Sequence, residues 1–138
     1  MAINFWKDKE SRQIDPELFS IKAEELAKDI DKEGRDDRNN AKKNKPSQIR
    51  KFYDEILKFK GIIAKEPNKF NELLPYIKIL NAKAAYVMGR DLISNKFKDF
   101  IADSLKQVND KDDFEVFASF FEAFMGYYKF YRPSEGGR

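Results

Sequence analysis

Apolar side chains recur every three or four positions through most of the chain, and no alternating run flanked by turn residues interrupts them. This spacing gathers apolar groups on one face of an α-helix. It is clearest in six aromatic residues that precede Pro133: Phe114, Phe117, Phe121, Phe124, Tyr128 and Tyr131. We predict helices without a sheet, the last helix being the most buried and carrying Phe121 and Phe124 in the core.

Two earlier helices have recognisable starts and ends. Asp15-Pro16 is a capping residue followed by a proline suited to the first helical position, and the helix that it opens ends at Gly34. Pro46-Ser47 opens a second helix, in which Ser47 can cap the N-terminus. This second helix ends before Pro67.

Two more helices complete the pattern, over about residues 69–88 and 92–108. Pro75 falls inside the first of these, so we expect a kink there or a helix start near Leu74. The predicted fold class is all-α, a single-domain five-helix bundle that spans residues 1–138.

A polar basic loop at about residues 34–46 separates the first two helices, with one alanine and no larger apolar side chain. Residues 35–45 offer little to bury, so we expect them to be mobile in the free protein. Nine basic and four acidic side chains give residues 34–60 a net charge of +5, against +3 for the whole chain. The positive excess therefore lies in this loop and at the start of the second helix.

The sequence has no cysteine and no histidine, which excludes disulfides, thiolate zinc sites and Ser-His or Cys-His catalytic arrangements. We therefore predict no catalytic residues, no metal site, no cofactor and no enzymatic activity. Apolar runs are far shorter than the roughly 20 residues that span a bilayer, and residues 1–9 do not resemble a signal peptide. We expect a cytoplasmic protein without a membrane partner.

A basic loop that enters a helix N-terminus suits phosphate, because lysines attract the anion and the first amides, at Gln48 and Ile49, can donate to it. Tyr53 could supply a ring for base stacking. The alternative is a solvated linker with ordinary surface charge. The candidate nucleic-acid-binding residues, the last two forming a second set, are Lys42, Lys43, Lys45, Gln48, Arg50, Lys51, Lys83 and Arg90.

Three short patterns, taken in order, resemble the small-subunit family of type III-A CRISPR (Csm) interference complexes. They are SQIRKFY at residues 47–53, YVMGR at residues 86–90, and FFEA followed by YYK within residues 120–129. The likeness covers about residues 46–132, which is most of the chain.

The resemblance implies a non-catalytic small subunit of a type III-A effector complex in antiviral defence. Such subunits contact the backbone of the duplex between target single-stranded RNA and guide RNA without sequence specificity. They line up with further copies of themselves as a filament, beside other subunits of the complex. The alternative function is a structural helical adaptor whose basic patch binds acidic protein partners rather than RNA.

Glu122 adjoins the aromatic face of the last helix, and a carboxylate that is partly buried needs a partner. Arg90 and Arg50 are the favoured partners, because a guanidinium matches the two oxygens of a carboxylate. The alternative is an exposed glutamate near a lysine.

Overall fold

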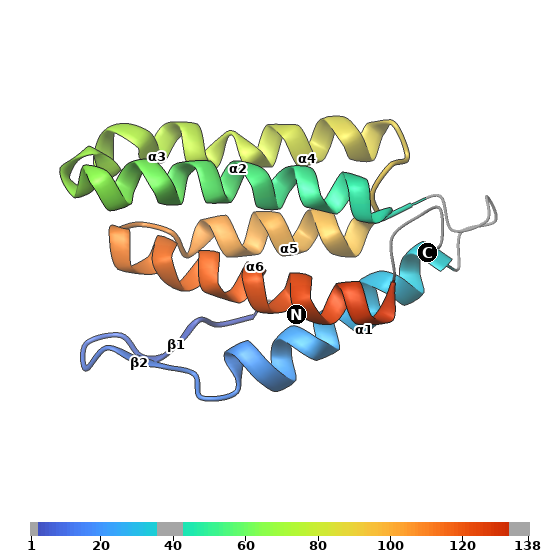
Figure 1. The fold of residues 1–138 in the computed structure, drawn as a ribbon, viewed down its shortest axis with the longest axis horizontal. Helices are drawn as coiled ribbons and strands as arrows, with labels where there is room; N and C mark the ends of the chain where they lie inside the picture. Colours follow the sequence, from blue (N-terminus) through green and yellow to red (C-terminus); the bar gives the residue numbers. More distant parts are fainter. Residues whose placement is uncertain (1–2, 36–42, 133–138) are drawn as a thin grey trace.

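The computed structural model describes residues 3–35 and 43–132, which form six α-helices and one two-stranded sheet (Figure 1). The helices are α1 (Ala23–Arg35), α2 (Pro46–Lys65), α3 (Phe70–Lys78), α4 (Leu80–Gly89), α5 (Asn95–Lys106) and α6 (Lys111–Tyr131). A π-helical turn, Leu18–Lys22, leads into α1, and a 3₁₀ turn, Pro67–Lys69, leads into α3. In Figure 1, α3 and α4 run end to end along α2, with α5, α6 and α1 on the other side of α2. The predicted all-α bundle is confirmed, with α3 and α4 in place of its third helix.

The third predicted helix is divided at Ile79, whereas Pro75 lies inside α3. At the division, the amide of Ile79 donates to the carbonyl of Tyr76 at 3.2 Å, so the last turn of α3 tightens. The next helix starts at Asn95 rather than at residue 92, because Ser94 caps it by accepting from the amide of Phe97.

A short hairpin precedes the helices and corrects the expectation that there is no sheet. Strand β1 (Trp6–Asp8) pairs antiparallel with β2 (Gln13–Ile14), with Trp6 opposite Ile14. Arg12, at a φ of 60°, turns the chain between them. The strands are too short for an alternating pattern to stand out in the sequence.

The hairpin is attached to the N-terminus of α6. Asp110 caps α6 in a capping box with Asp113, whose side chain is buried. The indole Nε1 of Trp6 donates to Asp113 at 2.9 Å, and the buried ring of Phe5 stacks on Phe117 with ring centres 6.1 Å apart. The contacts of Asp113 thus connect the start of the chain to its longest helix.

The core is centred on α6, as predicted. Phe121 and Phe124 are fully buried, and their ring centres lie 5.5 Å apart in an edge-to-face arrangement. Phe100 of α5 lies 5.6 Å from Phe121, and Phe97 connects this cluster to Phe52 of α2 at 5.3 Å. Aromatic packing of this kind fixes α2, α5 and α6 relative to one another.

Candidate nucleic-acid interface

Asn44 fixes the chain just before α2. Its side chain is fully buried and its φ is 60°, in the left-handed region that asparagine tolerates. Its Nδ2 donates to the carbonyl of Ile30 at 3.0 Å and to Ser94 Oγ at 2.9 Å, while its Oδ1 accepts from the amide of Ser94 at 2.9 Å. Its own amide donates to the carbonyl of Leu92 at 3.0 Å. These bonds connect α1, α2 and the start of α5.

The carbonyl of Asn44 is also satisfied, by the end of α6. The buried hydroxyl of Tyr128 donates to it, and Arg132 approaches it at 3.5 Å. Burial raises the pKa of Tyr128 to about 12, so this hydroxyl keeps its proton at neutral pH. Gly34 is required nearby, because a Cβ there would lie 2.6 Å from the carbonyl oxygen of Lys43.

These contacts revise the prediction that residues 35–45 are mobile. Residues 43–45 are held against the core by Asn44, with Lys43 and Lys45 half-buried on either side of it. This anchor could not be seen in the sequence, because Asn44 stands between lysines in a stretch with one alanine and no larger apolar side chain. Lys42 and residues 36–41 lie outside the described residues.

The N-terminal amides of α2 do not have the predicted role. The amides of Gln48 and Ile49 both donate to the carbonyl of Lys45, at 2.9 and 3.1 Å. Lys45 stands at the N-cap position without a side-chain cap, and Ser47 lies inside the helix rather than capping it. Any phosphate bound at this end must therefore be held chiefly by side chains.

The first turns of α2 separate two grooves. One groove, of about 670 Å³, lies between α2 and the C-terminal half of α6 and includes Arg50, Lys129 and the 76% exposed ring of Phe130. Arg132 also lines it, but that side chain is buried and lies 3.7 Å from Asp31. Of the residues that the structure describes, Arg50 and Lys129 are therefore the exposed cations that line this α2–α6 groove. Sequence reasoning missed Lys129 and Phe130 as candidate site residues.

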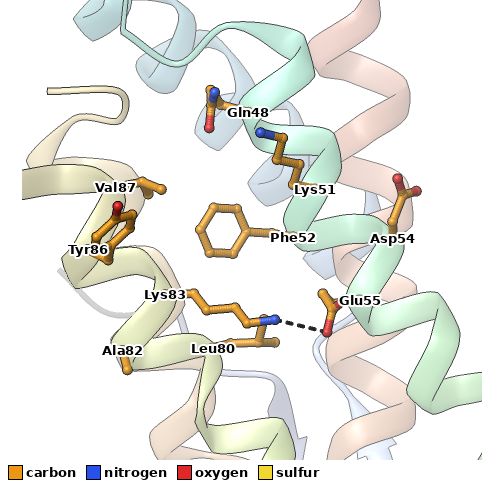
Figure 2. A pocket seen from close by; sticks show the side chains of 10 residues that line it. All are labelled: Gln48, Lys51, Phe52, Asp54, Glu55, Leu80, Ala82, Lys83, Tyr86 and Val87. Atoms are coloured by element: carbon orange, nitrogen blue, oxygen red, sulfur yellow. Dashed lines mark hydrogen bonds and ion pairs between the residues drawn. The ribbon is translucent and has the colours of Figure 1, made fainter. Parts of the chain in front are cut away.

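The second groove, of about 610 Å³, lies between α2 and α4. Figure 2 shows the ring of Phe52 between the two helices, with Gln48 and Lys51 towards one end. Towards the other end, Lys83 forms an ion pair with Glu55 at 3.2 Å, which offsets its charge. The predicted residues are thus divided, since Gln48, Lys51 and Lys83 line this α2–α4 groove and Arg50 lines the other.

Arg90 lies at the end of α4, exposed, with its guanidinium carbon 5.9 Å from the ring centre of Tyr86. Tyr86 lines the α2–α4 groove and is 65% exposed. Tyr53, proposed from the sequence for base stacking, instead stacks on Phe121 with ring centres 5.8 Å apart. Among the described residues, the exposed rings that line the two grooves are Tyr86 and Phe130, and neither was a candidate binding residue in the sequence analysis.

The predicted ion pair of Glu122 is wrong. Glu122 is exposed on α6, and within the described part of the chain no ion pair joins it to Arg50 or Arg90. The buried face of α6 is broad and includes both Phe120 and Phe121, but Glu122, at the next position, lies just outside it and faces solvent. Arg50 and Lys51 likewise have no ion pair among residues 3–35 and 43–132, so both charges are available to a ligand.

The described residues were also examined for clusters of metal ligands and for membrane-spanning helices. Within residues 3–35 and 43–132, no three carboxylates gather in a way that could hold a metal ion. In the same ranges, no helix combines the length and apolar character that crossing a bilayer requires.

The fold and its grooves define a small all-helical protein with basic side chains around the first turns of one helix. The Csm2 Type III-A family matches residues 16–134, and the chain belongs to this family. It is therefore a subunit of a type III-A CRISPR effector complex, and membership implies association with other Csm subunits. The resemblance seen in the sequence is confirmed. The family is a structural small-subunit family and is not a known catalytic one. Searches of curated proteins and of solved structures gave no significant match.

Proposed function

We propose that this chain is a non-catalytic subunit that contacts the backbone of the duplex between target RNA and guide RNA. The observation that carries the proposal is the placement of Arg50 and Lys51. These neighbouring cations are exposed, open into different grooves and have no ion pair in the described part of the chain. Lys43 and Lys45 precede them on a segment that Asn44 holds in place.

Side chains of this kind bind phosphate without reading sequence. A guanidinium or an ammonium group recognises phosphate oxygens, which every nucleotide carries, while base pairing with the guide supplies the sequence information. A subunit of an RNA-guided complex must accept any guide, and long exposed cations meet that requirement. Lys129 extends the same surface across the α2–α6 groove.

One copy offers few such cations, so its own affinity for RNA should be low and sensitive to salt. We propose that several copies line up on one duplex, because contacts in a row add avidity without new chemistry. We also propose that the protein acts in the cytoplasm, in antiviral defence.

The test is the binding of fluorescent RNA by the purified chain, followed by anisotropy from low to high salt. Two unrelated sequences should bind alike, and log affinity should fall linearly with log salt, by about 0.7 per phosphate contact for a single strand. A guide–target duplex should bind in the same sequence-independent way. Absence of RNA binding at low salt, together with salt-sensitive binding to an acidic Csm subunit, would replace this function with the protein adaptor.

A further inference from the structure

The α2–α4 groove combines an apolar floor with unpaired polar groups at its edge. Phe52, Leu80 and Val87 supply apolar surface, and Figure 2 shows the Phe52 ring projecting between the helices. Its volume of about 610 Å³ lies within the range of roughly 300–1,000 Å³ that is usual for ligand clefts. Gln48 and Lys51, near one end, have no side-chain partner among the described residues. Such a groove suits a ligand with a flat apolar body and a charged edge.

Tyr86 gives the groove a surface for stacking. Its ring is 65% exposed, and an aromatic ring left in water offers a large apolar face to a ligand. Arg90 lies 5.9 Å from the ring centre, and Lys51 lines the same groove from α2. Neither cation has a carboxylate partner in the described ranges, whereas Lys83 is paired with Glu55. Asp54 also lines the groove and has no ion pair in the described ranges, but Figure 2 shows it on the side of α2 away from Tyr86. The unpaired charge nearest the ring is therefore the positive charge of Arg90, which suits a phosphate attached to the stacked group.

We propose that the α2–α4 groove holds one unpaired nucleobase of the bound RNA, stacked on Tyr86, with the adjoining phosphates held by Lys51 and Arg90. This inference rests on the proposed function, because it requires that the chain binds RNA. Every base has a π face, so stacking of this kind remains indifferent to sequence. Gln48, at the rim, can donate to or accept from the edge of any base.

The experiment compares two RNA duplexes that differ at one nucleotide. The first carries a single unpaired 2-aminopurine nucleotide, and the second carries an abasic residue at the same place. The wild-type chain should bind the first at least about fivefold more tightly, as expected from one base–aromatic stack, and should quench its fluorescence. Tyr86→Phe should keep this preference.

Tyr86→Ala should abolish both the preference and the quenching while leaving the affinity for the abasic duplex unchanged. The matched control is Tyr76→Ala, which removes a 58% exposed ring from α3 and should keep the preference. Both side chains are exposed, so both variants should keep the wild-type thermal midpoint.

Four other outcomes would overturn the inference, and each one points to a different explanation. Equal affinity of the wild-type chain for the two duplexes removes the base site and leaves the backbone contact intact. An equal loss of affinity for both duplexes in Tyr86→Ala makes Tyr86 part of a phosphate contact instead. Loss of association with another Csm subunit in Tyr86→Ala, with unchanged RNA binding, assigns the groove to a protein. If neither duplex binds the wild-type chain, the proposed function itself fails.

Discussion

The side chain of Asn44 and the N-terminal cap of α5 at Ser94 are joined by two reciprocal hydrogen bonds. Asn44 Nδ2 donates to Ser94 Oγ at 2.9 Å, and the amide of Ser94 donates to Asn44 Oδ1 at 2.9 Å. Both residues are buried. The pair connects the residue that leads into α2 with the start of α5, and so sets where the basic first turns of α2 lie.

Asn44→Ala should therefore destabilise the protein by roughly 2–4 kcal/mol. It leaves the buried amide of Ser94 unpaired and puts an alanine at positive φ, and such an unpaired group alone costs about 1–3 kcal/mol. Urea unfolding followed by circular dichroism measures the change. Asn71→Ala, at an exposed position in α3, is the control and should stay close to wild type. Wild-type stability in Asn44→Ala would show that the anchor contributes nothing.

Two glycine-to-alanine changes should have opposite effects. At Gly34, the new Cβ would lie 2.6 Å from the backbone oxygen of Lys43, so the chain must shift and the protein should lose stability. At Gly61 of α2, the Cβ has open space, so alanine should add about 0.5–1 kcal/mol through its helix propensity. Thermal midpoints of both variants check the sign. Equal midpoints would mean that the chain does not pass so close to Gly34.

Phe121→Ala should cost roughly 3–5 kcal/mol, as truncations of a core phenylalanine do. Phe121 is fully buried and contacts rings on both α5 and α6. Phe130→Ala removes the same side chain from a 76% exposed position and should change the stability by less than about 0.5 kcal/mol. Similar destabilisation in the two variants, measured by urea unfolding, would contradict the burial described for α6.

Tyr128 should make stability depend on alkaline pH. Its pKa is raised by burial to about 12 in the folded state, above the ordinary tyrosine value of 10.0. Its contribution is therefore complete below pH 10 and is lost as the pH rises towards 12, because the unfolded chain then releases the proton more easily. Tyr128→Phe should be less stable than wild type at pH 8 by about 1 kcal/mol, because the hydrogen bond to Asn44 is removed.

This deficit of Tyr128→Phe should shrink between pH 10 and pH 12, the interval between the two pKa values. Tyr76→Phe, at an exposed position, should follow the wild-type curve. A deficit that stays constant across that interval would show that the hydroxyl of Tyr128 titrates as it does in the unfolded chain.

Helical spacing in the sequence was sufficient to predict the bundle, because a stripe such as that of α6 repeats over many turns. The hairpin was missed because strands of two or three residues are too short to show an alternating pattern of apolar and polar residues. Its attachment through Trp6 and Asp113 was missed because these residues are far apart in the sequence. The start of α5 was misplaced because Ser94 was not recognised as its cap.

The sequence was sufficient to predict most of the basic residues that belong to the candidate site. It was not sufficient to predict how they are arranged in space. Arg50 and Lys51 were found from local charge density, yet their separation into two grooves depends on where α4 and α6 pack against α2. Asn44 could not be singled out, since nothing local distinguishes a buried asparagine from a solvated one. Glu122 was assigned wrongly, and the stacking of Tyr53 on Phe121 was not foreseen, because the width of the buried face was unknown.

The central claim is that the exposed cations on the first turns of α2 contact RNA. The most direct measurement compares two double variants with the same change of charge on the same helix, Arg50→Gln/Lys51→Gln and Lys58→Gln/Lys60→Gln. Lys58 and Lys60 are exposed and lie about two turns further along α2. Anisotropy with one fluorescent RNA across a salt series, at matched folded concentration, gives both affinity and salt slope.

We predict that Arg50→Gln/Lys51→Gln weakens binding roughly tenfold at low salt, as removing two exposed charges from the interface would. Its salt slope should fall by about 0.7 for each phosphate that the variant no longer binds. Lys58→Gln/Lys60→Gln should stay close to wild type in both affinity and slope. Equal affinities and equal slopes for the two double variants would contradict the account, because net charge alone would then explain the binding.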